Sequence, residues 1–227
     1  MTQLLLGIAP QWIPTLDNFV AGRNQELHAA LRLKLDSNDG ERGFYLWGEA
    51  GSGRSHLLRG MVTEAQALGL DACYANASVP QAAEIVAVDD VEQMDAKAQI
   101  ALFALYNRQR ENGGMLLVSG NVAPMHLGVR DDLRTRLGWG MVYQVHGLND
   151  EEKAQALGKH AEARGFAVPK EVISYLLCHG RRNLPGLLAT LDALDEHCLR
   201  MKKRVASVPL LKDVMKRDGQ SLWNLGQ

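Results

Sequence analysis

The sequence predicts an α/β protein in which a parallel sheet flanked by helices is followed by a small all-α domain. Three observations support this class. Short apolar runs typical of buried strands alternate with segments of helical periodicity over about the first 145 residues. One predicted strand leads directly into a glycine-rich stretch, GEAGSGRSH, at residues 48–56. After residue 146 the alternation stops, and only helical patterns follow.

The elements of the sheet domain follow from their apolar patterns. A helix is predicted from Arg23, because Leu27, Leu31 and Leu35 recur on one of its faces. Each predicted strand is a short apolar run bounded by polar or turn-forming residues. The strands are residues 43–47, a brief strand near Cys73, and residues 84–90, 115–120 and 142–146. Helices are predicted between them at residues 54–68 and 95–112.

The helical domain is predicted from periodicity alone. Its helices are residues 149–165, 169–180, 184–203 and 208–216. The third is strongly amphipathic, because leucines recur on one face at 184, 187, 188, 191 and 194. We therefore divide the chain into an N-terminal arm (1–10), a sheet domain (11–148), a helical domain (149–218) and a tail (219–227).

Composition restricts the classes of function. Lys and Arg number 25 against 26 Asp and Glu, so the net charge of −1 argues against a domain that binds nucleic acid through phosphate contacts. Three widely spaced cysteines predict free thiols in a reducing compartment. The N-terminus lacks the basic and apolar regions of a signal peptide, and no apolar run is long enough to span a bilayer. We expect a cytoplasmic protein without membrane partners.

The glycine-rich stretch contains the residues of a phosphate-binding loop. Its glycines let consecutive backbone N–H groups converge on phosphate oxygens at a helix N-terminus, and Ser55 offers a hydroxyl to Mg²⁺. The alternative is that the glycines only form a tight turn. The predicted nucleotide-binding residues of this stretch are Gly48, Glu49, Ala50, Gly51, Ser52, Gly53, Arg54, Ser55 and His56.

Two acids follow the apolar run IVAV, where a parallel sheet presents its ligand-binding edge. Asp89 is expected to hold Mg²⁺ through a water, and Asp90 is expected to orient the attacking water. The alternative is that both acids cap the next helix.

Arg54 stands where the usual pattern, G-x-x-x-x-G-K-[ST], has lysine. Arginine keeps the charge but is planar and longer, so it cannot place a point charge at the same position between the phosphates. Nucleotide binding can survive this change, whereas turnover depends on accurate placement of charge. Asp90 is also one methylene shorter than the glutamate that such a base would use. We therefore expect weak or no intrinsic ATPase activity.

In series, these motifs resemble the AAA+ ATPases of the bacterial initiator (DnaA) clade. The similar segments follow the order of the family: TLDNFVAG, LWGEAGSGRSHLL, VDDVE, LYNRQRENG, LLVSGNVAP and LRTRLGWG. The resemblance extends from residue 12 to about residue 217 and implies a P-loop AAA+ core with a helical lid. Within the clade the chain is most similar to the regulators that inactivate the initiator, because the phosphate loop and the segment QLLLG at residues 3–7 are similar to theirs. We expect no counterpart of the initiator's C-terminal DNA-reading domain.

The chain also departs from the family pattern. Only about ten residues separate the strand near Cys73 from the strand at 84–90, so we expect the usual connecting helix to be reduced to a turn. Asn121 stands where close relatives have aspartate.

The resemblance implies roles for individual residues. It places Asp17, Asn18, Phe19 and Val20 around the adenine, Asn121 and Arg182 as the two sensors, and Arg136 as an arginine finger that acts in trans. The segment QLLLG, with Gln3, Leu4, Leu5 and Leu6, resembles the motif that docks on the DNA polymerase sliding clamp. The alternatives are a solvated helix carrying Arg130, Arg134 and Arg136, an arginine pair that flanks a helix start, and an apolar arm that packs on the core.

The implied function is regulation of replication initiation. Such a protein binds ADP or ATP with Mg²⁺, docks on the sliding clamp and stimulates ATP hydrolysis by the ATP-bound initiator DnaA. A homo-oligomer is compatible with this function, whereas direct sequence-specific DNA binding is not expected. The alternatives are a DnaA-related ATPase of the helicase-loader or transposition-helper type, and a small-molecule kinase, which would require lysine at position 54 and an acceptor pocket.

Overall fold

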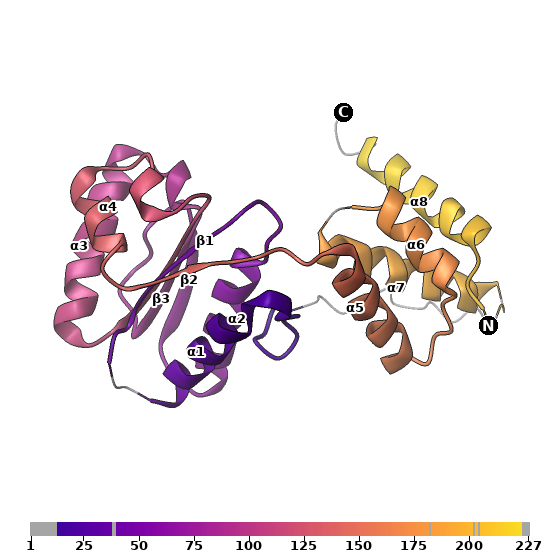
Figure 1. Cartoon of the computed structure of the whole chain (residues 1–227), viewed down its shortest axis with the longest axis horizontal. Helices are drawn as coiled ribbons and strands as arrows, with labels where there is room; N and C mark the ends of the chain where they lie inside the picture. The colour runs from indigo at the N-terminus through magenta and orange to yellow at the C-terminus, as the bar shows by residue number, and fades with distance from the viewer. Residues whose placement is uncertain (1–12, 38–39, 182, 202, 204, 224–227) are drawn as a thin grey trace, which may run out of the picture. The chain divides into compact units, whose positions relative to one another are not determined.

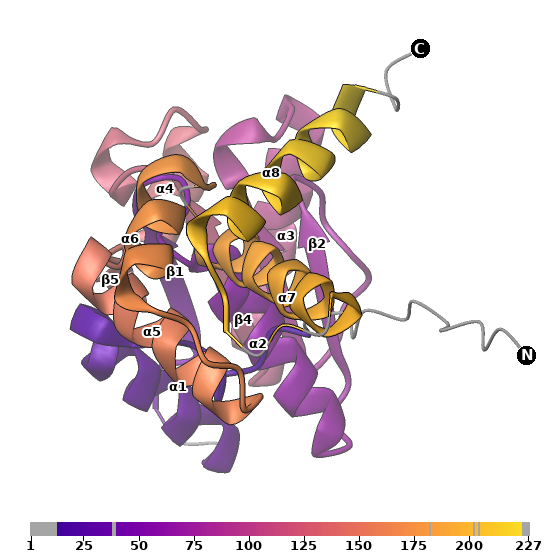
Figure 2. The same ribbon diagram turned by 90° about the vertical axis from the view of Figure 1, so that its right-hand side faces the viewer.

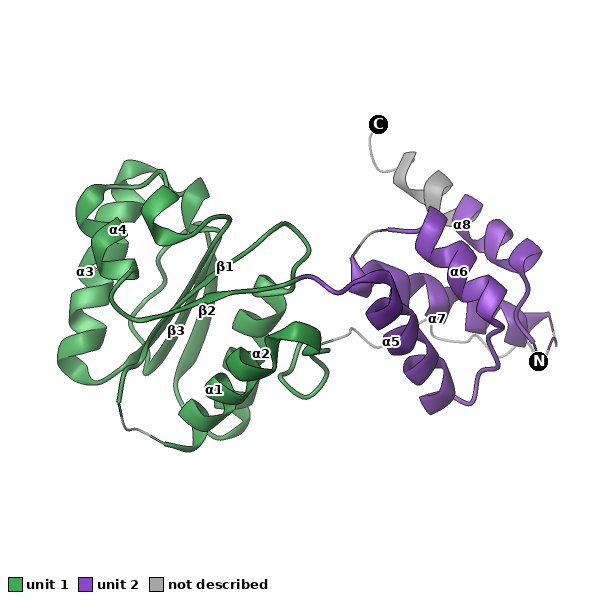
Figure 3. Cartoon of the chain, in the orientation of Figure 1, with its two compact units in different colours: residues 1–146 green, residues 147–227 purple. Residues whose placement is uncertain are grey.

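The computed structural model describes residues 13–37, 40–181, 183–201, 203 and 205–223 of the 227-residue chain. Two compact units divide the chain, residues 1–146 and 147–227, close to the predicted boundary at residue 148 (Figure 3). The first unit carries the sheet, and the second consists of helices.

The first unit contains a five-stranded sheet with parallel strands in the order β2-β3-β4-β1-β5. The strands are β1 (Gly43–Trp47), β2 (Ala72–Asn76), β3 (Ile85–Asp89), β4 (Met115–Gly120) and β5 (Met141–Gln144). The helices are α1 (Gln25–Asp36), α2 (Arg54–Ala67), α3 (Ala96–Asn112) and α4 (Asp131–Leu137), with short 3-10 turns at Gly22–Asn24, Val91–Gln93 and Pro124–His126. The predicted α/β class is confirmed.

Helices cover both faces of this sheet, with a hydrophobic core on each side (Figure 1). Successive residues of a strand point to opposite faces. Phe44 and Leu46 of β1 therefore join the core formed with α1 and α2, which includes Leu58. Tyr45 between them joins the core formed with α3 and α4, which includes Leu102. This layering leaves the carboxyl ends of the strands at one edge, where the glycine-rich loop follows β1.

The connection from β2 to β3 is unusually short for parallel neighbours. Residues 77–84, all of them described, contain no helix, as predicted from the spacing. Ala77 turns the chain with a φ of 46°, and its N–H donates to the carbonyl of Asp89 at 2.9 Å. Val79 and Ala83 pack against the core on the α3 side. The short connection thus holds the end of β2 directly beside the end of β3.

The second unit packs its helices around a core of its own (Figure 2). These helices are α5 (Asp150–Ala163), α6 (Lys170–His179), α7 (Leu184–Arg200) and α8 (Val208–Trp223). Helix α8 continues past its predicted end at residue 216 into the segment predicted as a tail. Gly219 within it costs about 1 kcal/mol relative to alanine but does not end a helix. No helix among the described residues has the length and apolar character needed to cross a membrane.

Candidate nucleotide site

The glycine-rich loop joins β1 to α2 and requires its glycines. Gly51 and Gly53 have φ angles of 81° and 105°, which side-chain-bearing residues rarely adopt. A Cβ on Gly53 would lie 2.9 Å from the ring of Phe19, and one on Gly48 would overlap the carbonyl oxygen of Val145. The loop therefore combines a special backbone conformation with close packing on both sides.

Arg54 begins α2 and is buried at the base of the loop. Its Nη2 lies 3.8 Å from Oδ1 of Asp90. Its Nη1 and the hydroxyl of Ser52 are buried and have no hydrogen-bond partner among the described residues. A buried donor without an acceptor is costly, and phosphate oxygens are strong acceptors. The loop thus retains donor capacity that fits a phosphate group, which favours the predicted nucleotide site over a simple turn.

The first acid of the predicted pair, Asp89, is completely buried at the end of β3. Its Oδ1 accepts a short hydrogen bond from the hydroxyl of Ser119, and its Oδ2 accepts one from the hydroxyl of Tyr74 at 2.8 Å. Burial is the main cause of a raised pKa for Tyr74, so the phenol remains a donor at neutral pH. A carboxylate and the hydroxyl of Ser55 are ligand types that Mg²⁺ accepts, usually with waters retained. The residue types therefore fit a water-mediated magnesium contact.

The second acid, Asp90, is contacted by Asn76, Ser119 and Arg54. It has left-handed backbone angles, φ 53° and ψ 52°, which aspartate tolerates better than most residues. Its Oδ2 accepts from the side-chain amide of Asn76 at 2.9 Å, and its N–H donates to the Ser119 hydroxyl at 3.1 Å. Helix α3 is instead capped by Asp95, which accepts from the N–H of Ala98. Neither acid caps α3, so the capping alternative is not what the structure contains.

The segment predicted to surround the adenine lies against the loop through Phe19. The Phe19 ring is 5.5 Å from the ring of His56 and 5.9 Å from that of His28, measured between centroids. His56 reaches the carbonyl oxygen of Thr15 at 2.9 Å. Burial is the main cause of its lowered pKa, and the bond to Thr15 acts in the opposite direction. These contacts hold the segment beside the loop.

The neighbours of Phe19 have mainly local roles in the structure. Asp17 is exposed and pairs with Arg32 of α1. Asn18 closes a turn by accepting from the N–H of Thr15 at 3.0 Å. Val20 is half-buried. Phe19 packs its ring beside His56 of α2, and the N–H of Asp17 donates to Oε1 of Glu64 on the same helix at 3.2 Å.

Asn121 follows β4 and its side chain is exposed. The hydroxyl of Tyr45 donates to the carbonyl of the adjacent Val122 at 2.8 Å, which fixes the loop that carries Asn121. Sequence reasoning did not identify Tyr45, Ser119, Tyr74 or Asn76 as parts of the site. Ser119 offered a signal, because it is a polar residue in the otherwise apolar strand MLLVSG.

Arg136 lies at the other end of β1 from the phosphate loop. Together with Gly43, Phe44 and Gly140 it lines a small cavity at the amino end of that strand. Strand β5 begins just after Gly140, with Met141 paired to Phe44. Because β1 has five residues and a strand rises about 3.3 Å per residue, about 15 Å of strand separates Arg136 from the chain's own loop.

The guanidinium of Arg136 contacts aromatic rings. Its Cζ lies 4.1 Å from the centroid of Trp139 and 5.8 Å from that of Phe103. Arg134 pairs with Asp131 and Arg130 pairs with Asp132, both at 2.8 Å. No ion pair involves Arg136 within the part of the chain that the structure describes. Helix α4 therefore carries one half-buried arginine whose charge is not neutralised locally.

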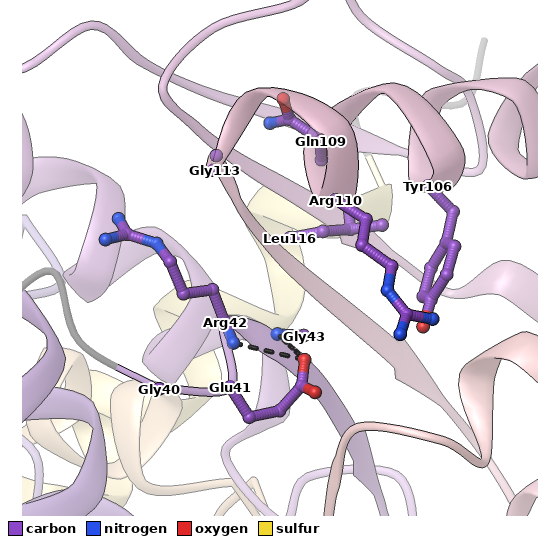
Figure 4. A pocket seen from close by; sticks show the side chains of 10 residues that line it. Gly40, Glu41, Arg42, Gly43, Tyr106, Gln109, Arg110, Gly113 and Leu116 are labelled. Atoms are coloured by element: carbon purple, nitrogen blue, oxygen red, sulfur yellow. Dashed lines mark hydrogen bonds between the residues drawn. The ribbon is translucent and has the colours of Figure 1, made fainter.

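A cavity of about 250 Å³ also lies at the amino ends of β1 and β4. Figure 4 shows Arg110 beside Tyr106 on one side of it and Glu41, which accepts from the N–H groups of Arg42 and Gly43, on the other. This cavity is at the opposite edge of the sheet from the phosphate loop. It does not form part of the candidate nucleotide site.

Two groups of predicted residues lie outside the described part of the chain. These are Arg182, the predicted second sensor, and Gln3, Leu4, Leu5 and Leu6 of the predicted clamp-binding arm. Their roles stay predictions.

Comparisons with known proteins show which solved structures share this fold. Domain III of the Thermotoga maritima replication initiation protein DnaA has 20% identity and a TM-score of 0.72, over 89% of this chain and 95% of that one. AMPPCP-bound DnaA from Aquifex aeolicus has 20% identity and a TM-score of 0.69, over 80% and 65%. The family model described as Hda, lid domain, matches residues 150–215. The chain therefore has the fold of these AAA+ structures, and residues 150–215 match the lid domain of Hda.

The AAA+ fold extends to more distant structures. The RuvB Holliday junction branch migration motor of Thermotoga maritima has 12% identity and a TM-score of 0.66, over 89% of this chain and 71% of that one. The chain spans 64% of the length of a DNA replication initiation factor that it matches with a TM-score of 0.68. The Hda-type lid comprises the second unit from α5 into α8. The predicted resemblance to DnaA-clade AAA+ proteins is thereby confirmed.

Proposed function

We propose that this AAA+ protein regulates replication initiation by stimulating ATP hydrolysis in an initiator of the DnaA type. In this proposal Arg136 enters the nucleotide site of the partner and stabilises charge on the transferring phosphoryl group. The chain's own loop holds adenine nucleotide, ADP or ATP, with weak or no hydrolysis. The arm with Gln3 to Leu6 docks the protein on the DNA polymerase sliding clamp.

The position of Arg136 carries the proposal. About 15 Å of strand β1 separates it from the chain's own loop, so it cannot serve the nucleotide bound there. Its charge has no ion-pair partner among the described residues, unlike those of Arg130 and Arg134. A half-buried arginine stacked on Trp139 loses little further conformational freedom when it engages a phosphate. These features suit an arginine that acts on another molecule.

The loop residues support nucleotide binding by the chain itself. Ser52 and Arg54 offer buried donors to the phosphates, and Phe19 offers an aromatic face beside the loop. Ser55 offers a hydroxyl to Mg²⁺, and Asp89 would reach the ion through a water only after one of its hydrogen-bond donors releases it. The ion would neutralise phosphate charge in the bound nucleotide.

The first prediction concerns Arg136 and uses a neighbouring arginine as control. We expect Arg136→Ala to abolish stimulation of the initiator's ATP hydrolysis, because a well-placed arginine finger contributes about 10³-fold or more in rate. Arg134→Ala on the same helix removes a charge that is already paired with Asp131 and should retain most of the stimulation. The measurement is initiator ATPase activity with clamp loaded on DNA. Retained stimulation by Arg136→Ala would refute the finger role.

The second prediction concerns the arm. Deletion of residues 1–8 should abolish capture of the purified protein by immobilised sliding clamp, and Gln3→Ala should weaken it. The Arg136→Ala protein should be captured as well as the parent, since the two functions use different segments. If the truncated protein is captured normally, the arm is not the clamp-binding element.

The alternative function, a helicase-loader type of ATPase, predicts a different behaviour. Brisk intrinsic ATP hydrolysis together with DNA binding by the purified protein would support it.

A further inference from the structure

The edge strand β2 contributes one side chain to each of the two site acids. Tyr74 donates its hydroxyl to Oδ2 of Asp89 at 2.8 Å. Asn76, two residues later on the same face of the strand, donates its amide to Oδ2 of Asp90 at 2.9 Å. The remaining oxygen of Asp89 accepts from Ser119, and that of Asp90 faces Arg54 at 3.8 Å. Every carboxylate oxygen of the pair therefore faces a donor or cation from the chain itself.

Arg59 and the turn after Asn76 fix the positions of the two β2 donors. Nη2 of Arg59 on α2 donates to the Tyr74 hydroxyl at 3.2 Å, and its guanidinium carbon lies 4.7 Å from the centre of the Tyr74 ring. On the side of Asn76, the chain turns immediately after this residue, at Ala77. The bond from Ala77 N–H to the Asp89 carbonyl ties this turn to β3. Both donors are thus fixed relative to the acids by backbone and side-chain contacts.

This arrangement limits access to the acids. Asp89 has no exposed surface, so a metal-bound water can reach it only when one of its donors moves away. Asp90 is half-buried, and Asn76 and Arg54 each engage one of its two oxygens, so an attacking water has to compete with both contacts.

We propose that strand β2 is a brake on the chain's own nucleotide site, with Tyr74 and Asn76 holding the acid pair away from metal and water. This inference rests on the proposed nucleotide binding. It explains why the bound nucleotide would depend little on Mg²⁺ and would be hydrolysed slowly. Bound nucleotide is held through the loop with little dependence on Mg²⁺, and its hydrolysis is slow. Tyr74 and Asn76 act through Asp89 and Asp90, so they are positioning residues.

The third prediction tests the brake by removing the two β2 groups that donate hydrogen bonds to Asp89 and Asp90. The double variant Tyr74→Phe, Asn76→Ala keeps the ring that packs beside Arg59 and removes only the two groups that bond the acids. ADP affinity is measured by calorimetry with Mg²⁺ and with EDTA. We expect the parent affinity to change by less than about 3-fold between the two conditions and that of the variant to change by about 10-fold or more, since each released hydrogen bond is worth about a factor of ten. Intrinsic ATP hydrolysis should rise in the variant.

Tyr143→Phe is the matched control. Tyr143 lies on β5, the opposite edge of the sheet, where its ring stacks on Phe44. This variant should retain the parent's weak magnesium dependence. If the double variant unfolds, Tyr74→Phe alone removes one hydroxyl and should still increase the magnesium dependence above that of Tyr143→Phe.

The outcomes separate the brake from the proposed function. If the parent binds no nucleotide under either condition, nucleotide binding fails and the brake fails with it. If the parent binds nucleotide only with Mg²⁺, or if the variants match it, the brake is overturned while the role of Arg136 stands. A magnesium dependence that appears only when the β2 donors are removed supports the brake.

Discussion

At the scale of residues, Arg54 illustrates how one exchange alters the chemistry of a phosphate loop. A lysine there would place a compact ammonium among the phosphates, whereas the guanidinium of Arg54 extends to within 3.8 Å of Asp90. The acid that sequence reasoning assigned to the attacking water is therefore engaged by the residue that replaced lysine. The other oxygen of Asp90 accepts a hydrogen bond from Asn76, which lies on β2, a strand that none of the sequence motifs includes.

The fourth prediction belongs to His56. Burial lowers its pKa below the ordinary value of 6.5, so the folded protein resists protonation that the unfolded chain accepts. Below about pH 6.5 the unfolded state binds more protons, and stability should fall as the pH decreases toward the lowered pKa. His56→Gln keeps a donor for the Thr15 carbonyl but does not titrate. Its melting temperature should fall less than the parent's between about pH 7.5 and about pH 5.5.

The control for this prediction is the exposed His126. His126→Gln should leave the acid sensitivity of the melting temperature unchanged. An identical decrease in the parent and in His56→Gln would show that other groups cause the loss of stability.

At the scale of elements, the strands and long helices were predictable because each carries its own periodicity. Strand β3 was expected at residues 84–90 and is found at Ile85–Asp89, and α3 was expected from residue 95, which proves to be its N-cap. The short crossover from β2 was predicted from spacing alone. Its consequence was not predicted, because the contacts of Tyr74 and Asn76 with the acids span 15 and 14 positions of the chain.

The end of the last helix shows the limit of local signals. The last helix was predicted to end at residue 216 and residues 219–227 to form a tail, yet α8 continues to Trp223. One glycine lowers helix propensity without ending a helix, and stop signals are reliable mainly when a cap and a break in apolar periodicity coincide. Element existence was therefore predictable here, and the element boundary was not.

At the scale of the whole molecule, each unit has a separate hydrophobic core. The core of the second unit includes Leu157, Leu176, Leu191 and Leu211, one from each of its four helices. A unit with its own core can fold alone. The first unit is organised by the sheet, which keeps the phosphate loop and Arg136 at opposite ends of β1.

The fifth prediction tests this independence. A fragment of residues 147–227 should be helical by circular dichroism and should unfold cooperatively. Leu191→Ala in the fragment should lower the free energy of unfolding by about 2–5 kcal/mol, because it leaves a cavity in the core. Leu199→Ala on the same helix changes a side chain that is 69% exposed and should cost less than about 0.5 kcal/mol. Equal effects of the two substitutions, or an unfolded fragment, would contradict a separate lid core.

The sequence by itself determined the fold class of this protein, the position of the glycine-rich loop between β1 and α2, and the reduced crossover. Those features are local: periodicity, glycine placement and spacing act over a few residues of chain. Only the tertiary structure decided that Arg136 lies away from the chain's own loop and that β2 supplies donors to both acids. These relations depend on which strands become neighbours and in which register, and that pairing is set by packing between segments far apart in the chain.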